Sequence, residues 1–185
     1  MRAMADRETA DGELGLVQAF VNTVDLQDGP EQLTDPDALR DWLVANRLMA
    51  ADSPVDRADF THAIAVREAM RAVIGGNSGL AVYPVDLATL NGAAAASGLR
   101  MRFGPGGRAR LEPEATGAVG ALGRLVAMLY AAMQSEDWRR LKLCGADSCR
   151  WVFYDRSKNR SSRWCTMASC GNRAKARRFR QKTKN

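Results

Sequence analysis

The chain has 185 residues, of which 46% are hydrophobic and 26% charged, and this length and apolar share suit one globular domain with or without a small module. The longest apolar run, residues 125–133, is too short to cross a bilayer. The N-terminal sequence MRAMADRETADGELG lacks the apolar segment of a secretory signal. These features argue against a membrane-spanning or secreted protein, and we expect a cytoplasmic one.

Taken in chain order, residues 1–12 are polar, and we expect them to be disordered. After them, apolar residues recur at helical spacing. The expected helices lie near residues 14–24, after the Asp35-Pro36 pair, at 56–74, from Pro84 to about 98, and at 114–134. Before the last helix, the alternating runs LRMRF and RARLE flank a GPGG turn, which predicts a β-hairpin over residues 99–112.

The pattern changes at the C-terminal end. There, LKLC and WVFYD are short strand-like runs on either side of a Cys-to-Cys turn, and CGNRAKARRFRQK is typical of a short basic helix. The predicted fold class is therefore α+β. A mostly helical body with one β-hairpin, residues 13–137, precedes a small C-terminal module at residues 138–185, a short β-hairpin plus a basic helix. The four cysteines of this module, Cys144, Cys149, Cys165 and Cys170, make it a predicted zinc finger.

The charge is unevenly distributed between these two parts. Residues 138–185 contain 15 Lys and Arg but only 2 Asp and Glu, which gives a net charge of +13. The whole chain carries +6 at pH 7, so residues 1–137 carry −7. A basic end on an acidic body indicates a polyanionic partner such as nucleic acid, or an interaction tail.

The four cysteines all lie in the C-terminal module. They form two C-x4-C pairs that fifteen residues separate: Cys144, Cys149, Cys165 and Cys170. Zn²⁺ takes four thiolates in a tetrahedron at about 2.3 Å, and each short loop can bring two sulfur atoms to one ion. The spacing predicts one Zn²⁺, and because four cysteines leave no open position, its role would be structural and not catalytic.

Other states of the cysteines remain open at this point. They could be four thiols that pack as small hydrophobic groups, disulfides, which a reducing compartment disfavours, or ligands of an iron–sulfur cluster. The single histidine, His62, lies far away in sequence on a predicted helix. We expect it to be an ordinary helix residue and not a metal ligand.

The C-terminal part, residues 141–182, resembles the CGNR zinc-finger family through the motif Cys170-Gly171-Asn172-Arg173, and its WVFYD and RWC segments also match. It departs from the pattern at Ser162, where a second basic residue often stands. The segments FVNTVD at 20–25 and LRDWLVANRL at 39–48 resemble the ABATE domain that precedes this finger. The resemblance implies a stress-induced bacterial transcription regulator.

The helix after Cys170 places cations on two opposite faces, with Ala176 and Phe179 between them as the expected inward contacts. Cations on a braced helix can neutralise phosphates, and a helix fits the major groove, where Arg can read guanine. The predicted nucleic-acid contacts are Arg160, Arg163, Arg173, Lys175, Arg177, Arg178, Arg180 and Lys182. A solvated charge run that only aids solubility is the alternative.

The leading functional hypothesis is a nucleoid-associated, zinc-containing, DNA-binding transcription regulator whose body senses an effector or pairs subunits in a homodimer. The alternative is an RNA-binding or ribosome-associated zinc protein, because the same cations fit RNA phosphates. We do not expect an enzyme, since the sequence offers no nucleophile–base pair, no phosphate-cradling glycine loop and no open metal site.

Two residues of the body are candidates for a small-molecule pocket. Asn22 lies beside an apolar helix stripe, and Arg67 lies in the long helix. Helix capping or a hydrogen bond within the core is the alternative role for both side chains.

Overall fold

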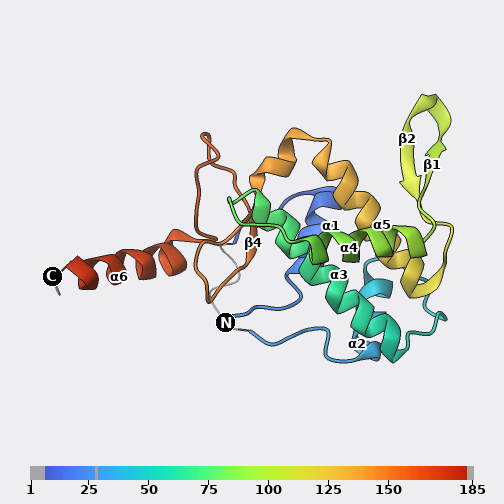
Figure 1. The fold of residues 1–185 in the computed structure, drawn as a ribbon, viewed down its shortest axis with the longest axis horizontal. Helices are drawn as coiled ribbons and strands as arrows, with labels where there is room; N and C mark the ends of the chain where they lie inside the picture. The colour runs from blue at the N-terminus through green and yellow to red at the C-terminus, as the bar shows by residue number, and fades with distance from the viewer. Residues whose placement is uncertain (1–6, 28, 183–185) are drawn as a thin grey trace.

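The computed structural model describes residues 7–27 and 29–182. Its helices and strands are α1 (Gly12–Val21), α2 (Pro36–Ala45), α3 (Arg57–Gly76), α4 (Pro84–Ala96), β1 (Arg100–Phe103), β2 (Ala109–Glu112), α5 (Gly117–Met133), β3 (Leu141–Leu143), β4 (Val152–Tyr154) and α6 (Asn172–Lys182). Short helical turns lie at Pro105–Gly107, Glu136–Arg140 and Met167–Gly171. The predicted α+β class, a mostly helical body with small hairpins, is confirmed (Figure 1). Of the helices in the described ranges, none combines the length and apolar character that a membrane crossing requires.

Capping side chains and a proline mark the N-terminal ends of two helices of the body. The Asp35 side chain accepts a hydrogen bond of 2.8 Å from the Ala38 N–H, and Pro36 stands at the first helical position, as its fixed φ allows. At the start of α3, Asp56 and Asp59 each accept a bond from the other's backbone N–H.

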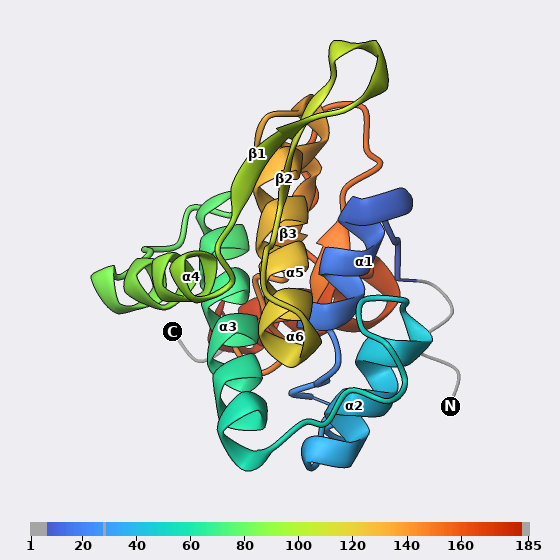
Figure 2. The same cartoon turned by 90° about the vertical axis from the view of Figure 1, so that its right-hand side faces the viewer.

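The apolar faces of these helices meet in one core. Figure 2 shows α3, α5 and α1 next to one another, while α4 packs on α3 and α5, and α2 contacts the same two helices. The fully buried side chains at the centre include Phe20, Leu43, Met70, Ile74 and Leu125.

The hairpin β3–β4 of the C-terminal part belongs to this same core. Leu141, Leu143 and Val152 are buried in one cluster with the apolar residues of α1, α3 and α5. The C-terminal part is therefore not an independent domain on a flexible linker, because these three residues of its hairpin are buried against the helical body.

Polar side chains of the body bind both edges of this two-stranded sheet. At the β4 edge, Asn22 donates to the Val152 carbonyl at 2.7 Å and accepts from the Val152 N–H at 3.0 Å. At the β3 edge, the Ser78 hydroxyl accepts from the Leu143 N–H at 2.9 Å, and Asn77 donates to the Leu141 carbonyl at 3.0 Å. These side chains satisfy backbone groups that a third and a fourth strand would otherwise bind.

The predicted disorder of residues 1–12 does not hold for the described part of that segment, residues 7–12. The Glu8 carbonyl accepts from the Tyr154 N–H at 3.0 Å, and Gln18 binds both Glu8 and Ala10. This segment continues along the β4 edge, so backbone pairing orders a stretch whose polar composition indicated a tail. Residues 1–6 lie outside the described residues.

We predict that Asn22→Ala lowers the free energy of unfolding by about 2 kcal/mol, because it leaves the buried N–H of Val152 without a partner. Urea unfolding of the zinc-saturated protein measures this. Asn91→Ala, at an exposed position of α4, is the matched control and should change stability by less than about 0.5 kcal/mol. Equal, small effects of both substitutions would contradict the assigned role of Asn22.

Candidate metal centre and nucleic-acid surface

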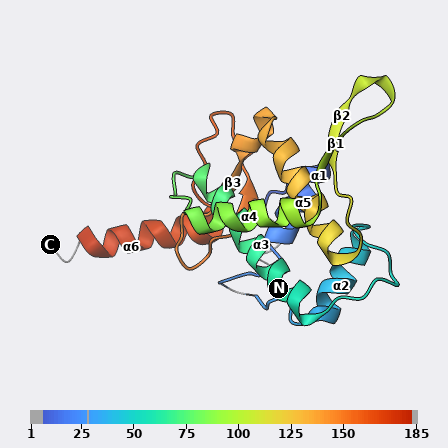
Figure 3. The same cartoon turned by 45° about the vertical axis from the view of Figure 1, so that its right-hand side comes forward.

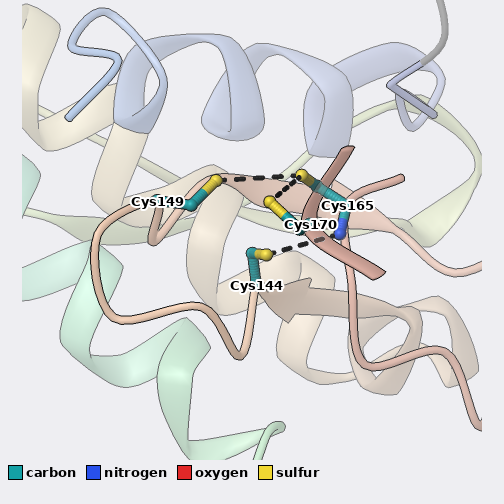
Figure 4. Close-up of side chains that lie close together, drawn as sticks. All are labelled: Cys144, Cys149, Cys165 and Cys170. Carbon is teal, nitrogen blue, oxygen red and sulfur yellow. Dashed lines mark hydrogen bonds between the residues drawn. The ribbon is translucent and has the colours of Figure 1, made fainter. Parts of the chain in front are cut away.

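Four cysteine side chains point toward one another where the β3–β4 turn meets the start of α6 (Figure 4). Cys144 and Cys149 come from the turn, Cys165 from the following loop, and Cys170 from the helical turn that leads into α6. All four are buried, at 1–5% exposure, and their sulfur atoms lie within 4.8 Å of one another.

The spacing of the sulfur atoms matches a tetrahedral metal site. The Sγ atoms of Cys149 and Cys165 are 3.8 Å apart, and those of Cys165 and Cys170 are 3.6 Å apart. A tetrahedron with Zn–S bonds of about 2.3 Å has edges of about 3.8 Å. None of the four cysteines is in a disulfide. The four sulfur atoms could therefore bind a zinc ion.

Backbone hydrogen bonds shape the two turns that carry these cysteines. In the first, the Cys149 N–H binds the Ala146 carbonyl at 2.8 Å, and Arg150 then takes a φ of +48°, which folds the chain back into β4. The Gly145 N–H binds the Arg163 carbonyl at 2.8 Å and so ties the first turn to the second. Thr166 caps the second turn by accepting from the Ser169 N–H at 3.2 Å.

The sulfur atoms cannot all ionise without a cation between them. Hydrogen bonds from Cys149 and Cys165 lower the pKa of the Cys144 thiol to about 2. The contact with Cys144 raises the pKa of Cys149 to about 12, and contacts with both of these residues, then burial, raise the pKa of Cys165. When one cysteine is a thiolate, its negative charge therefore keeps the neighbouring thiols protonated. A bound metal ion would offset the repulsion between thiolates and allow all four cysteines to lose their protons.

The loop between β4 and Cys165 is organised by a buried carboxylate that no local sequence signal indicated. Asp155 accepts hydrogen bonds from Lys142 Nζ at 2.8 Å, from the Ser157 N–H at 3.0 Å and from the Ser162 N–H at 2.9 Å. Burial acts to raise the pKa of Asp155, but these bonds outweigh it and hold the pKa below its usual range. The carboxylate thus closes the loop that returns the chain to the cysteines.

Arg173, predicted to contact nucleic acid, is turned toward the cysteine cluster. Its Nη2 atom donates to Cys170 Sγ at 3.1 Å and also binds Gln27 Oε1. A guanidinium beside a thiolate offsets negative charge at a metal site and orients the ligand. Gln27 is a body residue, and nothing in its local sequence indicated this contact.

The other basic residues of the C-terminal part form two sets, apart from Arg139, Arg150 and Lys158, which are exposed and lie outside α6. Those of the first set have acidic partners within 4.0 Å: Arg140 with Asp137, Lys142 with Asp155, Arg156 with Glu8 and Arg160 with Glu136. The second set is exposed and forms no ion pair with another described residue: Arg163, Lys175, Arg177, Arg178 and Arg180. Of the predicted nucleic-acid contacts, Arg160 thus belongs to the first set, and Lys182 lies in the last turn of α6.

Three cations of the second set surround a small groove. A cavity of about 150 Å³ lies between the 163–164 loop and the first turns of α6, and its walls include Arg163, Trp164, Lys175 and Arg178. Like charges around one hollow repel one another unless an anion lies between them. The groove is therefore suited to bind a phosphate-sized anion.

The inward contacts predicted for α6 are wrong. Phe179 is 71% exposed, and Ala176 is also exposed. The helix extends outward from the cysteine cluster and leaves the body along the long axis of the molecule (Figures 1 and 3). All residues from Lys175 to Gln181 are exposed.

The two pocket candidates of the body make hydrogen bonds within the fold. Asn22 binds the β4 backbone, and Arg67 forms a two-point ion pair with Glu31 at 2.7 and 2.8 Å and also binds Thr23 and Glu68. Both side chains are buried. These contacts correspond to the alternative role, and a ligand role for either residue stays a prediction.

Two family models match the chain, in the predicted order. The model for the ABATE family, whose description is "Putative stress-induced transcription regulator", matches residues 14–136. The model for the CGNR zinc finger matches residues 140–183, which include all four cysteines and α6. No curated protein matches the chain.

We predict that Arg173→Ala weakens zinc binding by roughly 10- to 100-fold, as expected for loss of a hydrogen bond to a metal ligand. Competition with a chromophoric chelator measures the affinity. Lys175→Ala, which removes a cation two residues away without touching a sulfur atom, is the control and should retain the wild-type affinity. Equal affinities for all three proteins would show that Arg173 does not support the metal site.

Proposed function

Because this chain belongs to the ABATE family and carries a CGNR zinc finger, we propose that it is a zinc-containing transcription regulator that binds duplex DNA through α6. The observation that supports this most directly is the second set of basic residues. Five exposed cations without an acidic partner among the described residues lie on α6 and the loop beside it. Elsewhere in the C-terminal part, Lys142, Arg156 and Arg160 are paired with carboxylates, whereas Arg139, Arg150 and Lys158 are exposed cations outside α6 that form no ion pair with another described residue.

In this proposal the metal is one structural Zn²⁺ held by Cys144, Cys149, Cys165 and Cys170. When bound, it supplies a positive centre that allows all four sulfur atoms to be thiolates. Four protein ligands leave no position for a substrate, so the proposal includes no enzymatic activity. The role of the site is to fix the first turn of α6 to the β3–β4 turn.

The geometry of α6 suits a nucleic-acid duplex. A projecting helix can enter the major groove, which is about 12 Å wide, and its arginines can reach phosphates on both sides. The basic groove beside Trp164 offers one seat for a backbone phosphate. Phosphate contacts of this kind give binding that weakens steeply with salt.

The helical body completes the proposal. We assign it the role of sensing an effector or pairing subunits in a homodimer, in a bacterial stress response, with the protein associated with the nucleoid in the cytoplasm. The contacts between the body and the β3–β4 hairpin support this assignment, because any shift of α1 acts on the backbone that carries the cysteines.

The test is the salt dependence of duplex DNA binding, measured by fluorescence anisotropy with the zinc-loaded full chain. We predict that Arg177→Gln/Arg178→Gln weakens binding and reduces the slope of log K against log salt by about 0.9 for each lost phosphate contact, or about 2 in total. Arg160→Gln, which removes a cation already paired with Glu136, should leave the slope nearly unchanged.

Two outcomes would contradict the proposal. If the Arg177→Gln/Arg178→Gln variant binds duplex DNA as the wild type does, α6 is not the contact surface. If the wild type binds structured RNA in clear preference to every duplex DNA, the protein is an RNA-binding zinc protein, the alternative that the same cations permit.

A further inference from the structure

A second basic element projects from the opposite end of the molecule. The hairpin formed by β1 and β2, called the arm below (residues 100–112), extends beyond the helices of the body, whereas α6 leaves at the other end of the long axis (Figures 1 and 2). Every residue of β1 is exposed, as are the first two residues of β2. Gly106 and Gly107 at the tip have φ values of +77° and +74°, which favour glycine, so the tip is narrow.

One face of the arm carries mostly arginine. The register places Arg100 opposite Glu112 and Arg102 opposite Arg110. Like charges directly opposite each other destabilise a pair of strands, and two strands alone are only marginally stable. Glu114, 3.7 Å from Arg102, and Glu112, 2.5 Å from Arg110, offset this repulsion in part. Residues 100–112 nevertheless contain four arginines and one glutamate, which leaves the arm with a net positive charge.

The acidic partners of the arm lie at its base. Glu114 accepts from Arg100 Nε at 2.6 Å and lies 3.7 Å from Arg102 Nη2, and Glu112 pairs with Arg110 at 2.5 Å. Exposed pairs of this kind contribute little to stability and exchange readily with other partners. Nearer the tip, Arg108 forms no ion pair with another residue of the described ranges, so the outer part of the arm is positive.

The other face of the arm is apolar and is not closed by packing. Met101 is 60% exposed and Phe103 is 75% exposed. An open cavity of about 760 Å³ lies between the arm and α5, with Leu111 on one wall and Met128 and Tyr130 on the other. The arm is thus attached at its base and reaches into solvent with arginines on one face and a phenylalanine on the other.

We propose that the arm is a second duplex-binding element, separate from α6. A two-stranded ribbon fits the major groove of DNA, its arginines can bind phosphates, and an exposed apolar side chain such as Phe103 can contact base edges. We choose DNA as the partner because of charge. The arm is positive, although residues 1–137 as a whole carry a net charge of −7, so the arm is a basic region on an acidic body. This inference rests on the proposed binding of duplex DNA.

The arm and α6 lie at opposite ends of the molecule, so they would contact well-separated parts of one duplex or two duplex segments. A test must therefore use a long duplex, of roughly 40 base pairs at about 3.4 Å each. We predict that Arg102→Gln/Arg108→Gln weakens binding of the zinc-loaded full chain to this duplex and lowers the salt slope by up to about 2. Arg40→Gln, an arginine of α2 that belongs neither to the arm nor to α6, is the matched control and should bind as the wild type does.

The outcomes separate the two proposals. The arm is not a DNA contact if its variant keeps the wild-type affinity and salt slope while the Arg177→Gln/Arg178→Gln variant loses affinity for the duplex. That result would leave α6 as the DNA contact. Failure of the wild type to bind any duplex would overturn both. If the arm variant binds DNA normally but shifts the oligomeric state in sedimentation, the arm contacts a second copy of this chain, and the proposal is wrong. The substitutions lie on exposed positions, and an unchanged unfolding curve would confirm that the fold is retained.

Discussion

The structure depends on the hydrogen bonds that hold the short hairpin β3–β4 between two helices of the body. Its strands have three residues each, which is too few for stability in isolation. Asn22 on one edge and Asn77 and Ser78 on the other supply the backbone partners that this hairpin lacks. Because the turn of the hairpin carries two of the four cysteines, these bonds also set the position of the metal centre and, through it, of α6.

The metal centre and the body therefore support each other. The cysteine cluster is buried, and its sulfur atoms need a cation to become thiolates together. The body supplies contacts to the periphery of the cluster: Gln27 meets Arg173 and Cys170, and buried Arg7, paired with Asp25, lies 4.2 Å over the Trp151 ring. Removing the residues after Arg140 would not yield an intact helical body, since Leu141, Leu143 and Val152 complete its core. The function of the C-terminal part is better examined by substitutions than by truncation.

Much of the architecture could be predicted from periodicity and spacing. The apolar pattern indicated the helices, and GPGG between alternating runs indicated the first hairpin, because these signals are local. Whether a polar side chain serves the fold or a partner was not predictable, since it depends on which distant residue lies next to it. Asn22 meets a strand 130 positions away, Arg160 meets Glu136, and Arg173 turns back to a sulfur atom. Phe179 was expected to face inward because it separates charged faces, but in the structure it is 71% exposed.

The central claim is that a zinc-braced helix reads duplex DNA, and selection from a random duplex pool at about physiological salt tests it most directly. The zinc-loaded full chain would be compared with the Arg177→Gln/Arg178→Gln variant, which retains the cysteines and the core. The account predicts a recovered consensus sequence that the variant fails to select. Binding to the pool without any consensus, equally sensitive to salt for every polyanion, would contradict it and leave a zinc-braced element that binds phosphates without reading sequence.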